Sequence, residues 1–165
     1  MSRLLGLAPV LDENTRLLVL GSFPGVASLR AQQYYGHPQN HFWKILGALW
    51  QQPLTEMPYP ERVAALRAHG LGLWDVYQAC EREGSLDADI RAAELNDLAS
   101  LRQRCPRLLA IAHNGGESFR HAKHTQALGL PVYQLPSTSP ANASWSFERK
   151  RAAWAEVLRR HGLAP

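Results

Sequence analysis

The chain has 165 residues, 45% of them hydrophobic, and 18 Lys and Arg against 14 Asp and Glu give a net charge of +4. This length can bury one core and leaves no room for a second domain, so we expect a single domain over residues 1–165. The basic excess favours a polyanionic partner such as nucleic acid without requiring one, because many enzymes carry a few extra lysines and arginines.

Membrane-spanning and secreted classes are not expected. No stretch of 18 apolar residues occurs, and the N-terminal residues show no apolar run with a small-residue cleavage site. We therefore expect a cytoplasmic protein. Its two cysteines, Cys80 and Cys105, are too few for a four-cysteine metal site, and a reducing compartment disfavours a disulfide.

Short apolar runs and helical patterns alternate along the chain. Four β-rich runs predict strands at residues 15–22, 71–77, 107–114 and 131–136. Helical patterns cover residues 38–51, 60–70, 92–105, 116–127 and 147–162. The alternation predicts an α/β protein, a three-layer α/β/α sandwich around a central, mostly parallel four-stranded sheet.

Helix-terminus signals support two of these helices. Pro60 occupies a first-turn position and Gly70 a stop, which together bound the helix at 60–70. Ser146 is a predicted N-cap for the last helix, and Gly162 marks its end.

Each predicted strand leads into an unusual segment. "GSFPG" (21–25) follows the first strand, Asp75 lies near the end of the second, "HNGGES" (113–118) ends the third, and "LPSTSPAN" (135–142) ends the fourth. Any one of these is compatible with ordinary turn chemistry. Because ligands bind beyond the carboxyl ends of strands in open α/β sheets, the four together predict a site at that edge.

Single motifs leave the chemistry open. "HNGGES" is compatible with a phosphate cradle or a plain helix start, but it lacks the lysine and spacing of a Walker loop. Ser118, Ser137 and Ser139 do not occupy the GxSxG elbow that a serine hydrolase needs. His37 and His113, which lie near the predicted site, do not indicate a metal site, so we expect neither a metal nor a cofactor.

Taken together, the segments resemble the uracil-DNA glycosylase superfamily over most of the chain. "GSFPG" is similar to its first motif, a strand followed by a Gly-x-x-Pro-Gly turn. "YYGHPQNHFW" (34–43) looks like the helix start of its mismatch-specific branch, and "LPSTSPAN" resembles its second motif. Phe23 in the first motif with "STSPAN" in the second is the pattern of the hypoxanthine-DNA glycosylase branch.

The resemblance implies roles for individual residues. Phe23 stands where other branches place the Asp or Asn that orients the attacking water, and Ser137 stands where His or Asn faces the base carbonyl. Tyr35 aligns with the aromatic that stacks on the extruded base. Asn40 aligns with the catalytic Asn of the hypoxanthine branch, in which deoxyinosine is the substrate.

The chemistry fits these residue types. Cleaving an N-glycosidic bond requires an extruded nucleotide, stabilisation of charge on the leaving base, and a water molecule, but no strong nucleophile. Asn40 is able to hold that water or hydrogen-bond the base, since an amide both donates and accepts. Backbone N–H groups around Ser22 and Phe23 are expected to meet a base carbonyl, and Asp75 stands where some relatives place a base-reading amide or lysine.

Every assignment has a structural alternative. Asn40 is also a plausible cap for the following helix, and Asn114 a turn residue or pocket wall rather than a catalytic group. Tyr34 competes with the preferred Tyr35 for the pocket. Ser85 and Asp87, in the acidic segment 82–90, are expected to fix a loop beside the pocket.

DNA contacts are expected from both motifs and from the last helix. Their residues are Gly25, Ser139, Pro140, Asn142, Arg149 and Lys150. Arg149 and Lys150 belong, with Arg151, to the clearest basic cluster, whose structural alternative is a solvated helix face. Relatives often carry a bulky wedge in the second motif, where this chain has Ala141 and Asn142.

The sequence therefore predicts a monomeric DNA glycosylase for base excision repair, acting on double- or single-stranded DNA. Hypoxanthine is the expected base, with uracil or mismatched thymine next. Two alternatives remain: a catalytically weak nucleotide- or DNA-binding module, because Phe23 removes the usual water-activating group, and a small-molecule nucleosidase or hydrolase using "HNGGES".

Overall fold

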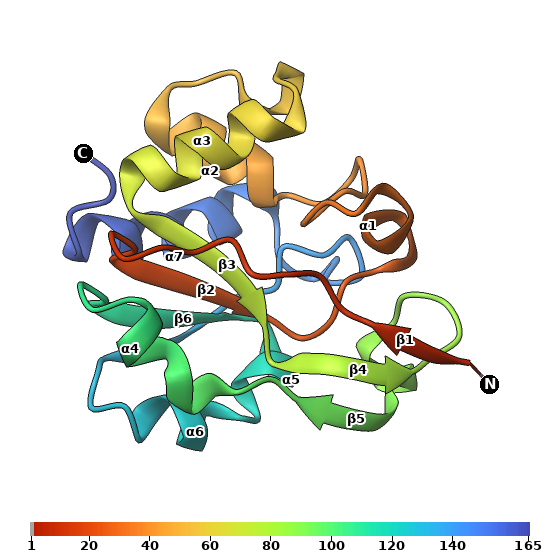
Figure 1. Ribbon diagram of the computed structural model, residues 1–165. Helices are drawn as coiled ribbons and strands as arrows, with labels where there is room; N and C mark the ends of the chain where they lie inside the picture. The colour runs from red at the N-terminus through yellow and green to blue at the C-terminus, as the bar shows by residue number, and fades with distance from the viewer. Residues whose placement is uncertain (1) are drawn as a thin grey trace.

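The computed structural model describes residues 2–165 and has a central sheet of four strands. Its strand order is β3-β2-β6-β7, and each neighbouring pair is parallel (Figure 1). The strands are β2 (Leu17–Gly21), β3 (Leu71–Asp75), β6 (Ala110–Asn114) and β7 (Val132–Leu135). All four expected strands are present. Every residue of β2, β3 and β6 is buried, as in a sheet covered on both faces.

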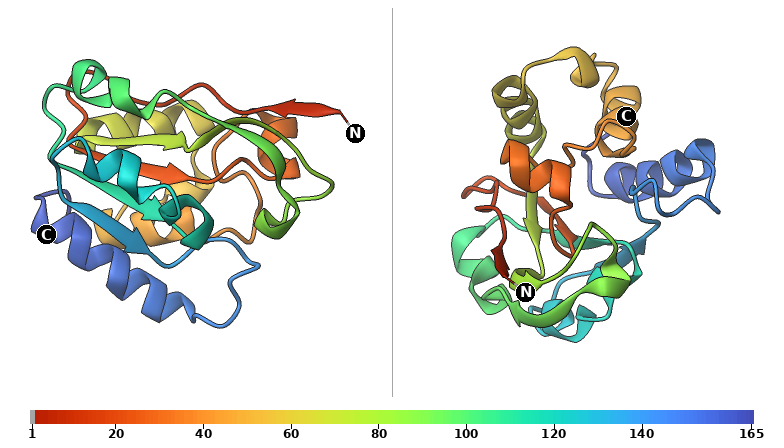
Figure 2. Two further views of the ribbon diagram at one scale, coloured as in Figure 1. Left: turned by 90° about the horizontal axis from the view of Figure 1, so that it is seen from below. Right: turned by 90° about the vertical axis from the view of Figure 1, so that its right-hand side faces the viewer.

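Alternate residues of β2 face two separate cores. Leu17 and Val19 belong to the core that includes residues of α2 (Phe42–Trp50), α3 (Tyr59–His69) and α7 (Phe147–Arg160). Leu18 and Leu20 belong to the core formed with η3 (Leu98–Ser100) and α4 (Leu101–Arg104). Figure 2 shows α2 and α7 on the side of the sheet opposite α4 and α6 (Ala122–Gln126). The predicted three-layer α/β/α sandwich is confirmed.

A second sheet corrects the prediction of a helix at 92–105. It has the order β1-β4-β5 and is antiparallel, with β1 (Arg3–Leu5), β4 (Tyr77–Glu81) and β5 (Arg91–Leu95). The first part of the predicted helix is thus a strand, and only η3 and α4 are helical. Pairing with the open edge of β4 outweighs the weak helical preference of this segment, because tertiary context overrides local propensity.

Several predicted boundaries also differ. The run 71–77 spans two strands, because the chain leaves the central sheet after Asp75 and enters β4 at Tyr77. The helix expected from 38 begins at Phe42, and the helix expected at 116–127 is divided into α5 (Gly116–Phe119) and α6. Three short helices were not predicted: α1 (Val26–Ala31), η1 (Leu54–Glu56) and η2 (Asp87–Asp89).

The predicted end of α3 and the predicted start of α7 are confirmed, whereas α7 ends at Arg160, before the expected stop at Gly162. Pro60 lies in the first turn of α3, which ends at Gly70 with a φ of 79°. Ser146 caps α7, and its side chain accepts a hydrogen bond from the Arg149 N–H at 3.2 Å. Cys80 and Cys105 are buried free thiols. No helix within residues 2–165 is both long enough and apolar enough to cross a membrane.

Parallel pairing aligns the carboxyl ends of the four strands. Gly21 pairs with Asp75 across β2 and β3, and Asn114 pairs with Leu135 across β6 and β7. The segments that follow these strands therefore leave the sheet at one edge, where the candidate site lies.

Candidate active site

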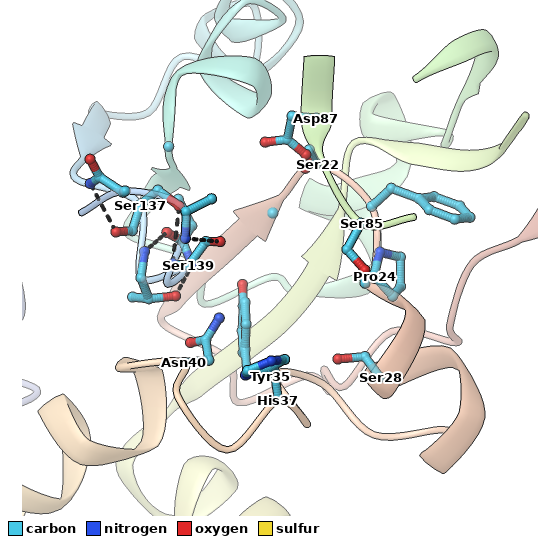
Figure 3. Close-up of a pocket in the computed structure, with 18 of the residues that line it drawn as sticks. Ser22, Pro24, Ser28, Tyr35, His37, Asn40, Ser85, Asp87, Ser137 and Ser139 are labelled. Atoms are coloured by element: carbon cyan, nitrogen blue, oxygen red, sulfur yellow. Dashed lines mark hydrogen bonds between the residues drawn. The ribbon is translucent and has the colours of Figure 1, made fainter. Parts of the chain in front are cut away.

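A cavity of about 690 Å³ opens at this edge of the sheet. Segments that follow all four central strands line it, together with the start of α1 and residues 34–40 (Figure 3). Ten of the predicted site residues contribute to its wall: Ser22, Phe23, Gly25, Tyr35, Asn40, Asp75, Asn114, Ser137, Ser139 and Asn142. The remaining three, Pro140, Arg149 and Lys150, are not part of this wall.

Two side-chain hydrogen bonds connect the turn after β2 to the segment that follows β4. The Ser22 hydroxyl donates to Asp87 at 2.6 Å, and the Ser85 hydroxyl accepts from the Val26 N–H at 2.9 Å. These bonds place both residues as expected, fixing the loop 82–90 beside the pocket. Figure 3 shows Ser22 with Asp87, and Pro24 with Ser85, on the same wall of the cavity.

Arg82 is the anchor of this turn. Its guanidinium donates to the carbonyls of Pro24 and Gly84, both at 2.7 Å, and lies 5.4 Å from the centre of the Phe23 ring. Phe23 is only 7% exposed and packs into the α4 side of the core. Arg82 was not among the predicted site residues, because its burial depends on the Pro24 carbonyl, which is far from it in the sequence.

The two tyrosines point in different directions. Tyr34 is buried, and its hydroxyl donates to the Ala8 carbonyl at 2.9 Å. The Tyr35 ring stacks on Phe42 with centroids 4.3 Å apart, and its hydroxyl points into the cavity (Figure 3). Tyr35 has a φ of 54°, a left-handed conformation that is uncommon for a residue other than glycine.

Asn40 both supports the start of α2 and faces the cavity. Its Oδ1 accepts a hydrogen bond from the Phe42 N–H at 2.9 Å, at the start of α2. This bond orients the amide so that its Nδ2 remains available (Figure 3). The neighbouring His41 N–H donates to the Thr138 carbonyl at 2.9 Å, which connects this helix start to the second motif.

The second motif is a loop held by its own hydroxyls and by Asn114. Ser137 Oγ accepts from the Ser139 N–H at 3.2 Å, and Asn142 Nδ2 donates to the Ser137 carbonyl at 3.1 Å. Gly115 has a φ of 94°, and a Cβ there would lie 3.0 Å from the Ser137 Cβ. Gly115 of "HNGGES" therefore allows the close approach of this loop.

Lys150 departs from the expected surface cluster. Its side chain is 1% exposed, and Nζ donates to the Ser139 carbonyl at 3.3 Å and lies 3.2 Å from His41 Nδ1. The amine thus braces the second motif and is not free to contact a phosphate. Arg149 is exposed, and its guanidinium lies 4.1 Å from the centre of the Trp145 ring at the cavity wall.

Asp75 carries the most perturbed carboxyl of the cavity. It is 5% exposed, and burial, followed by the charge of Asp87, raises its pKa to about 7, while Arg82 opposes the shift. Its Oδ2 has no hydrogen-bond partner among residues 2–165. The cavity therefore combines an aromatic face, an oriented amide and a carboxyl that is protonated in part at neutral pH.

Known proteins are similar to this chain in sequence. The uracil DNA glycosylase superfamily model matches residues 8–158. Hypoxanthine DNA glycosylase of Methanosarcina barkeri is 40% identical over 155 residues, covering 94% of this chain and 98% of that protein. Hypoxanthine DNA glycosylase of Methanosarcina acetivorans is 40% identical over 154 residues, covering 93% and 97%.

A solved structure has the same fold as this chain. The solution NMR structure of a candidate uracil DNA glycosylase from Methanosarcina acetivorans superimposes with a TM-score of 0.88 at 38% identity, covering 98% of this chain and 99% of that one. The chain belongs to the uracil DNA glycosylase superfamily.

Proposed function

We propose that this protein is a monofunctional DNA glycosylase that extrudes hypoxanthine from DNA and hydrolyses its N-glycosidic bond. The glycosylase class follows from the superfamily, and the two Methanosarcina relatives are named for hypoxanthine. Uracil and mismatched thymine are the next candidates. One observation carries the proposal: the Tyr35 ring and the Asn40 amide line the same cavity.

Each group has a part in the reaction. Tyr35 stacks on the extruded base, a contact worth roughly 1–3 kcal/mol in single-strand binders. Asn40 Nδ2 holds the water or a base oxygen, with its position set by the bond to the Phe42 N–H. Backbone N–H groups of the Ser22–Phe23 turn meet a base carbonyl, and Ser137 faces the base from the opposite wall.

The DNA backbone meets the rim of the cavity. Ser139, Pro140 and Asn142 approach phosphates or the minor groove, with Gly25 on the facing wall. Arg149 supplies positive charge from the start of α7. Lys150 supports this contact indirectly through Ser139.

The protein acts as a monomeric, single-domain enzyme in the cytoplasm, on double- or single-stranded DNA. Buried, free Cys80 and Cys105 fit a reducing compartment.

Labelled oligonucleotides test this function. The protein is incubated with duplexes that carry deoxyinosine, deoxyuridine or a G·T mismatch, and with the matching deoxyinosine single strand, and abasic sites are then cleaved with alkali. Strand cleavage at deoxyinosine, faster than at the other lesions, is expected. Binding without cleavage of any substrate would instead favour a binding module, and release of free base from nucleosides alone would favour a nucleosidase.

A further inference from the structure

Two buried polar atoms in the cavity wall lack partners. Asp75 Oδ2 and Tyr35 Oη are both inaccessible to solvent, and neither has a hydrogen-bond partner within residues 2–165. Buried polar groups are almost always paired in folded proteins, since leaving one unpaired costs about 1–3 kcal/mol. Because both residues line the cavity, these atoms are placed to pair with a ligand.

Hydrogen bonds fix the backbone on both sides of the Asp75 side chain. The Asp75 carbonyl accepts from Asn96 Nδ2 at 2.8 Å, and the next residue, Val76, donates to the Gly21 carbonyl at 2.8 Å. A Cβ at Gly21 would lie 2.5 Å from Asp75 Oδ1 and 3.2 Å from Tyr35 Oη. The Asp75 carboxyl and the Tyr35 hydroxyl therefore both lie close to Gly21. The absence of a side chain at Gly21 leaves room for both groups.

The charged and titratable groups around Asp75 decide its protonation. Asp87 of η2 raises the pKa of the carboxyl, and Arg82 after β4 lowers it by less than burial raises it. Tyr34 and Tyr35 also face it, and burial together with the Asp75 charge raises the pKa of both hydroxyls far above neutrality. The guanidinium of Arg82 donates to carbonyls rather than to Asp75.

We propose that Asp75 is the general acid of the reaction and donates its proton to the extruded base as the glycosidic bond breaks. This inference rests on the proposed glycosylase function. The bonding electrons pass to the ring nitrogen of the base, and the carboxyl proton moves to a nitrogen or oxygen of the base, which leaves neutral. The water oxygen bonds to the sugar C1′, and the proton that the water releases restores the Asp75 carboxyl.

This step accounts for Phe23. A benzyl side chain cannot activate water, so a site with Phe23 needs help on the leaving-group side of the reaction. A base that departs neutral develops less negative charge in the transition state, which makes an unactivated water sufficient.

The Asp75→Asn variant tests the proposal. Asparagine keeps the shape of the carboxyl but has no acidic proton. Single-turnover rates are measured on a deoxyinosine duplex with enzyme in excess, from about pH 5 to about pH 9. We expect the wild-type rate to fall as the pH rises through about 7, and D75N to be about 100-fold slower and flat across this range.

The Asp87→Asn variant provides a second readout that does not require D75N to fold. It removes a charge that raises the pKa of Asp75, while its side-chain oxygen still accepts from Ser22. The falling limb of the pH profile should therefore move to lower pH in D87N.

Three results would overturn the proposal: a wild-type rate that rises with pH, a D87N profile that does not move, or a D75N loss that is the same at every pH. The first would indicate a carboxylate acting on the sugar, and the third a structural role. Lack of wild-type activity on every lesion would refute the proposed glycosylase function itself, which separates the two failures.

Discussion

Both ends of the Asn114 side-chain amide are bonded to Thr138. Nδ2 donates to Thr138 Oγ1 and Oδ1 accepts from the Thr138 N–H, each at 3.0 Å. The pair is buried and joins the end of β6 to the second motif. Asn114 thereby holds the second motif in place while it also lines the cavity.

Removing this amide should loosen the loop. We expect Asn114→Ala to lower the free energy of unfolding by about 2–3 kcal/mol, because it leaves the buried Thr138 N–H unpaired. Thr138→Val removes only the Oγ1 acceptor and should cost less, about 1 kcal/mol. Urea unfolding measures both. Equal stability of N114A and wild type would contradict the bracing role.

The two functions of Asn40 are separable by substitution. Asn40→Ala removes both the Oδ1 acceptor and the Nδ2 donor, whereas Asn40→Asp keeps an oxygen for the Phe42 N–H, loses the donor and adds a negative charge. Both variants should lose about 10²-fold in single-turnover rate while retaining DNA binding. Only N40A should lose stability, by about 1 kcal/mol. An unchanged rate in N40D would show that the amide donor is not used.

The ring of Tyr35 should affect DNA binding, and its hydroxyl should affect stability. Tyr35→Ala is expected to weaken binding to deoxyinosine DNA by roughly 1–3 kcal/mol, because the stacking face is lost. Tyr35→Phe keeps the ring and removes an unpartnered buried hydroxyl, so its free energy of unfolding should not fall. Fluorescence anisotropy and urea unfolding separate the two effects. A Y35F protein less stable than wild type would indicate that the hydroxyl is paired in the free enzyme.

Arg149 and Lys150 are adjacent, but substituting them should affect the salt dependence of DNA binding differently. Arg149 is exposed, so Arg149→Gln should reduce the slope of log K against log salt by up to about 0.9 if one phosphate contact is lost. Lys150→Met should leave the slope unchanged and lower stability, since its amine pairs with the Ser139 carbonyl. Titrations of labelled duplex at several salt concentrations provide the comparison. A reduced slope in K150M would mean that the buried amine reaches DNA.

Two buried groups should give opposite dependences of stability on pH. Burial lowers the pKa of His113 from 6.5 to about 4, so the unfolded state binds more protons in that window and stability falls on acidification. The pKa of Asp75 is raised from 3.8 to about 7, so the folded state binds more protons and stability falls as pH rises. Each contributes a slope of up to about 1.4 kcal/mol per pH unit.

Replacing one of these two groups leaves the pH dependence of stability that the other group produces. D75N should lose stability as the pH falls from 6.5 to 4, owing to His113. His113→Asn should lose stability as the pH rises from 4 toward 7, owing to Asp75. Urea unfolding across this range tests both, and slopes of the same sign in the two variants would contradict the assignment.

Much of the fold was accessible from the sequence because its signals are local. Short β-rich apolar runs predicted all four central strands, and Ser146 and Gly70 predicted helix ends, since capping depends on residues within one turn. The strand β5 was missed because its polar residues pair with β4, a partner set by the tertiary fold. The burial of Lys150 was missed for a similar reason, because its partners lie on other elements.

The sequence by itself determined the α/β/α architecture, the family and the order of the segments that line the cavity. Only the tertiary structure decided how they act: the Tyr35 hydroxyl points into the cavity whereas the Tyr34 hydroxyl donates to the Ala8 carbonyl, Asn114 braces a loop, and burial raises the pKa of Asp75 to about 7. The physical reason is that side-chain direction, hydrogen-bond pairing and protonation depend on groups brought together by the sheet edge. Those groups are far apart in the chain, so no local pattern reports them.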